Sequence, residues 1–303
     1  MSEVLVVGEA LVDIVERRDG THAEHPGGSP ANVALGLGRL GRAACLLTRL
    51  GTDPRGQRVQ EHLVASAVSL VPGSTDAPRT STATARIDAA GVASYTFDLD
   101  WRLPDPLVVP EALALHTGSI AAFLTPGGDQ VLRLVEKTVP HATISYDPNI
   151  RPVLMGEPEA ARERVEHLVS LADVVKVSDE DLAWLAPGQE PEAVAESWLA
   201  RGPAVVVVTR GGSGAVALTA GGRVDVRAPR IEVVDTVGAG DSFMAGLLDH
   251  LATADLLGED RRARLHAIDT EQVAAMLSHA ARIAAITCSR AGANPPTRAE
   301  LDA

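Results

Sequence analysis

The sequence contains few aromatic, cysteine and lysine residues, and each shortage excludes something. Aromatic residues make up only 3% of the 303 residues, so alanine, valine and leucine must fill the core. The two cysteines, Cys45 and Cys288, are isolated, which indicates reduced thiols and a cytoplasmic protein. Lys137 and Lys176 are the only lysines, and the net charge of −13 argues against nucleic acid or an anionic membrane as a partner.

Segments for targeting, membrane insertion or transition-metal binding are also missing. The first stretch, MSEVLVVGEALVDI, has no basic region and carries Glu3 and Glu9, unlike a signal peptide. No run of 18 apolar residues exists to span a membrane. The nine histidines show no HExxH or CxxC-type spacing, so we expect no transition-metal site.

Short apolar runs alternate with helical patterns along the chain. Helical patterns cover 30–41 and 191–202, and buried strands are expected at 4–8, 43–51, 143–147, 173–177 and 204–209. This alternation predicts an α/β fold, a doubly wound and mainly parallel sheet with helices on both faces.

Two regions depart from that alternation and predict a small second sheet. Residues 10–26 alternate polar and apolar side chains around a turn at Asp19-Gly20, and residues 80–98 do so around Ala90-Gly91. Both resemble hairpins that form a lid beside the main sheet. Because no repeat or linker interrupts the chain, we expect one domain over residues 1–303.

The segment GGSPANVALGLGRLG, residues 27–41, is the first candidate site. Gly27 and Gly28 precede a helix with Pro30 in its first turn, and Gly41 ends it. A turn before a capped helix explains the glycines without any function. Asn32 supports a second interpretation, in which its amide binds the hydroxyls of a polyol beside the exposed backbone.

The segment DTVGAGDSF, residues 235–243, is the second candidate. Gly238 and Gly240 let successive N–H groups point into one concavity at the start of a helix, which suits an anion. Asp241 would repel a static phosphate, but it can accept the proton of a hydroxyl that attacks one. An acidic residue that only favours the helix dipole remains the alternative, although it leaves the glycines unexplained.

Other nucleotide-binding motifs are absent. Strand one ends in VVGEALVD without GxGxxG, neither lysine follows a glycine as in a P-loop, and protein-kinase signatures are missing. Phosphate binding is therefore expected to rest on the loop 238–241.

These two segments resemble the two signatures of the ribokinase (PfkB) family of carbohydrate kinases, in the family's order and separation. The likeness extends from about Val4 to Pro296, and SYDPNIRP (145–152) and VVKVSDEDL (174–182) are most similar to fructokinases. The resemblance implies an ATP-dependent sugar kinase with a ribokinase-like α/β fold and a β lid. It also implies ATP and Mg²⁺ as cofactors, with K⁺ as an activator.

The resemblance assigns roles to individual residues. The predicted catalytic residues are the base Asp241 and its anion-binding neighbours Gly238, Ala239 and Gly240. The predicted sugar contacts are Asp13, Gly27, Gly28, Asn32 and Arg151. Those for the nucleotide are Ser178, Thr209, Gly211, Gly214 and Gly240. A Mg²⁺ contact is assigned to Asp181. A monovalent cation is assigned to Asp235, Val237, Thr287, Arg290 and Gly292.

Two departures from the family pattern leave alternatives open. Its N-x-x-E motif is replaced here by Ser178 to Asp181, which fits both a Mg²⁺ contact and a capping box that opens a helix. Ala281 stands where an adenine-contacting Asn or His is common, so the adenine contacts are undefined. The similarity to fructokinases implies fructose as the acceptor, phosphorylated on its 6-hydroxyl, with another ketose, ribose, 2-keto-3-deoxygluconate or a nucleoside as alternatives. A sugar-binding regulator without catalysis is a third interpretation, and exposed lid edges allow a homodimer.

Overall fold

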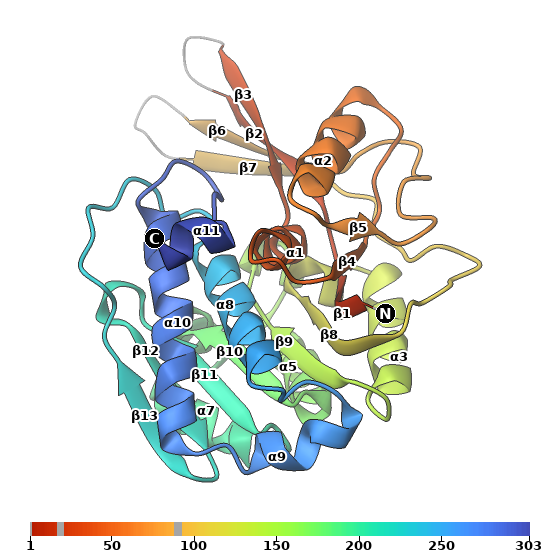
Figure 1. The fold of residues 1–303 in the computed structure, drawn as a ribbon. Helices are drawn as coiled ribbons and strands as arrows, with labels where there is room; N and C mark the ends of the chain where they lie inside the picture. Colours follow the sequence, from red (N-terminus) through yellow and green to blue (C-terminus); the bar gives the residue numbers. More distant parts are fainter. Residues whose placement is uncertain (1, 17–20, 88–92) are drawn as a thin grey trace.

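A nine-stranded sheet forms the centre of the computed structural model, which describes residues 2–16, 21–87 and 93–303. Its strand order is β13-β12-β11-β10-β9-β8-β1-β4-β5, and only β12 and β13 pair antiparallel to their neighbours. The strands are β1 (Ser2–Val7), β4 (Ala44–Leu47), β5 (Ser69–Leu70), β8 (Ala112–Gly118), β9 (Thr143–Asp147), β10 (Val174–Ser178), β11 (Val205–Thr209), β12 (Ala215–Thr219) and β13 (Gly222–Val226). The expected mainly parallel sheet is confirmed (Figure 1).

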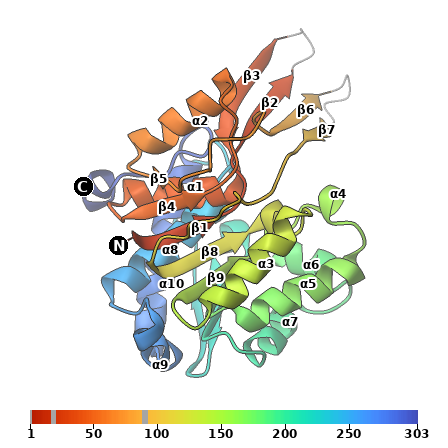
Figure 2. The same ribbon diagram turned by 90° about the vertical axis from the view of Figure 1, so that its right-hand side faces the viewer.

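Helices cover both faces of this sheet, as the second view shows (Figure 2). One face carries α1 (Ser29–Arg39), α8 (Ala239–Thr253) and α10 (Thr270–Cys288), and the other carries α3 (Gly127–Thr138), α5 (Pro158–Leu171) and α7 (Pro191–Leu199). Alternate residues of one strand serve the two cores. Val4 and Val6 of β1 pack on the α1/α8/α10 side, whereas Leu5 and Val7 pack on the opposite side.

The remaining helices complete the fold around these layers. They are α2 (Pro54–Ala65), α4 (Pro152–Met155), α6 (Asp179–Leu185), α9 (Arg262–His266) and α11 (Arg298–Asp302), with 3₁₀ turns at Ser119–Ala122, Gly211–Ser213 and Glu259–Arg261. No helix within the described residues combines the length and apolar character needed to cross a membrane.

A four-stranded sheet projects from one end of the large sheet (Figure 1). Its order is β3-β2-β6-β7, formed by β2 (Leu11–Glu16), β3 (His22–Gly27), β6 (Thr82–Ile87) and β7 (Ala93–Asp98). Both regions expected to form lid strands do so: β2 pairs with β3, and β6 pairs with β7. Parallel pairing between β2 and β6 joins the two regions into one sheet. The turns placed at Asp19-Gly20 and Ala90-Gly91 lie outside the described residues.

The parallel strands of the large sheet end at one common edge, where ligands of open α/β sheets bind. β9 ends there at Asp147, β10 at Ser178 and β11 at Thr209. β1 ends at Val7, and the chain continues through Glu9 into β2 of the small sheet. The two sheets therefore meet at the edge that the sequence motifs occupy.

Candidate active site

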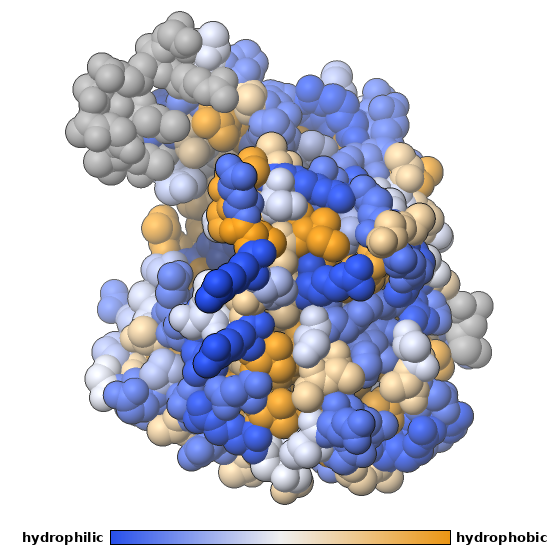
Figure 3. Space-filling view, turned by 60° about the vertical axis from the view of Figure 1, so that its left-hand side comes forward, coloured by the Kyte–Doolittle hydropathy of each residue, from blue (hydrophilic) through white to orange (hydrophobic). Residues whose placement is uncertain are grey.

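A pocket of about 530 Å³ opens where the small sheet meets this edge of the large sheet. The surface is hollowed between the part that carries the small sheet and the larger body of the molecule (Figure 3). β2, β7, α1, the loop after β9 and the start of α8 all contribute to its wall. Of the predicted site residues, the pocket brings together Asp13, Gly28, Asn32, Arg151, Val237, Gly238, Gly240 and Asp241.

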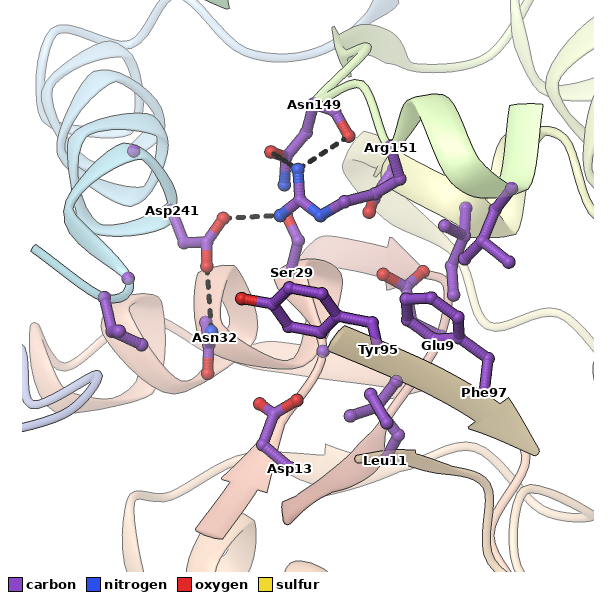
Figure 4. A pocket seen from close by; sticks show the side chains of 18 of the residues that line it. Glu9, Leu11, Asp13, Ser29, Asn32, Tyr95, Phe97, Asn149, Arg151 and Asp241 are labelled. Atoms are coloured by element: carbon purple, nitrogen blue, oxygen red, sulfur yellow. Dashed lines mark hydrogen bonds between the residues drawn. The ribbon is translucent and has the colours of Figure 1, made fainter. Parts of the chain in front are cut away.

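The carboxylate of Asp241 lies in the first turn of α8 and is held by two donors from α1 (Figure 4). Ser29 Oγ donates to Oδ1 at 2.7 Å, and Asn32 Nδ2 donates to Oδ2 at 2.8 Å. The side chain is 8% exposed, at the wall of the pocket. A carboxylate fixed in this way, with oxygen lone pairs left over, can accept a proton from a bound hydroxyl. The sequence did not identify Ser29.

The glycines before α8 permit a tight approach between two loops. Gly238 has φ +74°, a left-handed conformation, and a Cβ there would lie 2.6 Å from the Cβ of Ala293. At Gly240 a Cβ would lie 3.1 Å from Lys176 Nζ. The N–H of Ala239 donates to the carbonyl of Thr236 at 3.2 Å. If Ala239 binds an anion as predicted, that bond must first be given up.

The first glycine pair makes room for the acid on β2. A Cβ on Gly27 would overlap Oδ2 of Asp13, so a side chain here would displace the carboxylate. Gly28 caps α1 with φ +103°, and a Cβ there would lie 2.5 Å from the carbonyl oxygen of Glu9. At both glycines, the nearest atom that a side chain would meet belongs to a residue that lines the pocket.

Three carboxyl groups line the pocket, and burial raises the pKa of two of them. Burial raises the pKa of Asp13 to about 6, against the lowering effect of Arg151 and His25. Burial also raises the pKa of Glu9 to about 7, despite hydrogen bonds that include the Ala121 N–H at 3.2 Å. The sequence analysis used Glu9 only to exclude a signal peptide, because its burial depends on the tertiary fold.

Replacing Glu9 by glutamine should stabilise the protein at pH 8 but much less at pH 5. The folded-state pKa of Glu9 is raised from 4.5 to about 7, so the folded protein takes up a buried charge as the pH rises through that value. Stability is lost in that direction, and an amide avoids the loss. We expect Glu9→Gln to add roughly 1–3 kcal/mol to the free energy of unfolding at pH 8. Urea unfolding at both pH values measures this, and equal effects at both would contradict it.

Arg151 and two aromatic rings face the carboxyl groups across the pocket (Figure 4). Arg151 Nη1 donates to Asn149 Oδ1 at 2.8 Å, which orients the guanidinium. Tyr95 and Phe97 come from β7, with ring centroids 6.3 Å apart. Their i, i+2 spacing in a predicted lid strand was the available sequence signal. Trp101, which follows the small sheet, is buried and donates to the Ala121 carbonyl at 2.9 Å, so it does not line the pocket.

Of the predicted nucleotide residues, Gly240 lines this pocket, whereas Ser178, Thr209, Gly211 and Gly214 do not. Ser178 and Thr209 are register partners at the ends of β10 and β11. Gly214 has φ +103°, and a Cβ there would overlap the Val226 carbonyl, so packing alone requires this glycine. Gly211 has φ +49° with no atom within 4 Å, which leaves open space for a ligand.

Asp181 forms the capping box that we considered as an alternative to metal binding. Ser178 Oγ accepts from the Asp181 N–H at 3.0 Å, and Asp181 Oδ2 accepts from the Ser178 N–H at 3.4 Å. Asp181 Oδ1 also accepts from the Ile150 N–H at 3.0 Å. Within the described residues, there is no group of three or more His, Cys, Asp or Glu side chains that could hold a metal ion. Mg²⁺ would thus depend mostly on phosphate oxygens, as is usual for this ion.

The predicted monovalent-cation residues come from the loop before α8, the end of α10 and the loop that follows α10. Asp235 Oδ1 accepts from the Val237 N–H at 3.0 Å and Oδ2 accepts from the Gly292 N–H at 2.9 Å. These N–H groups lower the pKa of Asp235. Thr287 is buried and donates to Ser242 Oγ at 2.9 Å, whereas Arg290 points to Glu300. Asp235 therefore joins the loop before α8 to the loop after α10, whereas the Arg290 side chain pairs with Glu300.

Comparisons with known proteins agree with this geometry. A family model described as "pfkB family carbohydrate kinase" matches residues 1–300. A fructokinase from Rhizobium leguminosarum bv. trifolii is 36% identical over 276 residues, covering 86% of this chain and 83% of the relative.

Solved structures give the same result for the fold. A fructokinase from Xylella fastidiosa with bound ATP superposes with a TM-score of 0.83 at 26% identity, covering 99% of this chain and 96% of that one. A fructokinase double mutant from Vibrio cholerae O395, with fructose, ADP and potassium ion bound, gives 0.80 at 28% identity, with coverage of 99% and 95%. The ribokinase-like fold expected from the sequence is confirmed.

Proposed function

Since the chain belongs to the pfkB family of carbohydrate kinases, we propose that it transfers the γ-phosphate of ATP to the 6-hydroxyl of fructose. The observation that carries this proposal is the carboxylate of Asp241, fixed by Ser29 and Asn32 in a pocket that it shares with Asp13. The fructokinases among the relatives and structural neighbours support fructose as the acceptor.

The arrangement suggests how each residue would act. Asp13 accepts hydrogen bonds from sugar hydroxyls, and Arg151 limits where the sugar can lie. Asp241 accepts the proton of the 6-hydroxyl as its oxygen bonds to the γ-phosphorus and the bond to the ADP oxygen breaks. The N-terminal end of α8, with Gly238 and Gly240, stabilises the charge on the transferring group. Bound Mg²⁺ neutralises phosphate charge.

A panel of acceptors tests this proposal. We expect ADP formation with fructose, and a kcat/KM for fructose above those for ribose, 2-keto-3-deoxygluconate and adenosine on the same preparation. A tenfold preference for another acceptor would change the substrate but leave the kinase in place. If no acceptor in the panel supports ADP formation, the result would favour a sugar-binding regulator instead.

Activity should be lost in excess EDTA and restored by Mg²⁺, because the negative charge of the ATP phosphates must be neutralised and the chain has no P-loop lysine. Replacing sodium by potassium should raise the rate through the two loops joined by Asp235 and Gly292. Coupled-enzyme assays in matched buffers measure both effects. Full turnover in EDTA contradicts the first expectation, and equal rates in sodium and potassium contradict the second.

We propose further that the enzyme is cytoplasmic and that two copies pair through their small sheets. The edge strands β3 and β7 have one unpaired side within the described sheet, which supports such pairing. Light scattering after size exclusion distinguishes a monomer from a dimer.

A further inference from the structure

A buried ion pair lies directly beneath the start of α8, outside the pocket described above. Lys176 Nζ on β10 is 2.9 Å from Asp147 Oδ2 at the end of β9, and the two side chains are 5% and 1% exposed. Lys176 is one of only two lysines in the chain. Apart from this ion pair, no hydrogen-bond donor of the described residues reaches either oxygen of Asp147.

The ammonium group touches the loop predicted to bind phosphate. A Cβ added to Gly240 would lie 3.1 Å from Lys176 Nζ, so a side chain here would press against the ammonium and shift it by a few tenths of an ångström. Gly240 itself lines the pocket, next to Asp241. One glycine therefore separates the cation from the space that a phosphate would occupy.

Helix stability does not explain a cation at this position. The N-terminal end of a helix carries partial positive charge, so a lysine there is unfavourable. A buried ion pair is also a weak source of stability, because removing two charges from water offsets most of their attraction. Attraction between the ammonium and an anion that arrives with the substrate would offset both costs.

The surroundings keep Lys176 charged. Burial alone would favour the neutral amine, but Asp147, and at longer range Asp241 and Asp181, outweigh burial and raise its pKa. His116 faces the same group from β8, and burial together with the charge of Lys176 lowers the pKa of His116 to about 3. A neutral His116 therefore adds no second cation, and the positive charge beneath Gly240 belongs to Lys176.

We propose that Lys176 is the cationic component of the phosphate site, held by Asp147 behind Gly240 to stabilise the negative charge of the transferring phosphoryl group. This inference rests on the proposed kinase function but not on which sugar is the acceptor. It adds a cation to the loop 238–241, on which phosphate binding is expected to rest. Lys176 is a positioning and electrostatic residue, since it acts on the phosphate across the Gly240 backbone.

The test compares Lys176→Met, Asp147→Asn and the double variant, with Lys137→Met as the control for loss of one lysine charge at an exposed site. Calorimetry measures the affinity for ADP and for adenosine, and steady-state kinetics measures kcat/KM for ATP. We expect Lys176→Met to lower kcat/KM for ATP roughly 30- to 100-fold. Its affinity for ADP should fall while its affinity for adenosine stays within about twofold of the wild type.

The double variant separates this role from a purely structural one. It contains no unpaired buried charge, so a pair that only joins β9 to β10 would regain normal ADP affinity and kinetics. We expect the double variant to stay impaired, and Asp147→Asn, which keeps the ammonium, to lose less than Lys176→Met.

Recovery in the double variant, or equal losses from the two single changes, would overturn the inference while the wild type still turns over ATP. A wild type that fails to bind ADP would overturn the proposed function and this inference together.

Discussion

Asp241→Asn should lower kcat by roughly 10²–10⁴ while fructose and ATP still bind. An amide has the shape of the carboxylate, and it can accept from Asn32 Nδ2 and donate to Ser29 Oγ, the groups that now lie 2.8 and 2.7 Å from the carboxylate oxygens. It cannot accept the proton of the attacking hydroxyl. The expected loss is therefore in the chemical step, because an interaction with the transition state is removed and one with bound substrate is not.

Single-turnover kinetics and fructose titration by calorimetry measure the two quantities separately. Ser29→Ala is the matched control, because it removes one donor to Asp241 but leaves the base in place. We expect it to cost roughly tenfold in kcat, the effect of one hydrogen bond to a charged group. An Asp241→Asn enzyme with near-normal kcat would show that another group accepts the proton.

Asp13→Ala should raise KM for fructose about 100-fold and leave KM for ATP nearly unchanged. The carboxylate lies in the pocket wall on β2, away from the ends of β10 and β11 where the nucleotide residues are predicted. Removing it leaves buried sugar hydroxyls without an acceptor. Loss of the Asp13 carboxylate is therefore expected to weaken binding of the sugar but not of ATP.

Gly27→Ala provides an independent check on Asp13. Its Cβ would overlap Oδ2 of Asp13, so the carboxylate must move without losing its charge. We expect the same selective increase in KM for fructose, although smaller. Equal increases in KM for fructose and ATP in either variant would indicate general damage to the fold.

The large sheet was predictable where apolar runs were unbroken, and less so where polar residues are buried in it. Thr143–Asp147 was predicted with its bounds, because this strand is buried throughout. No strand was predicted at Ala112–Gly118, although β8 lies between β1 and β9. Its buried His116 and Thr117 interrupt the apolar pattern, and their partners, Ser145 Oγ at 3.0 Å and the Val7 carbonyl at 2.8 Å, are far away in sequence.

The same distinction applies to the site. Local spacing predicted the capping box of Ser178 and Asp181, because its two partners are three residues apart. Ser29 and Lys176 could not be assigned to the site in this way. Their contacts with Asp241 and Gly240 exist only once helix α1 and strand β10 have packed against helix α8.

Asp13 and Asp241, the two carboxylates predicted to act on the sugar, are linked through one short stretch of backbone. Gly27 contacts Asp13, and Ser29 donates to Asp241, so two consecutive peptide units join the neighbours of both carboxylates. These units span about 7 Å of chain at most. The distance between the group predicted to hold the sugar and the group predicted to take its proton is therefore set through this short stretch of backbone.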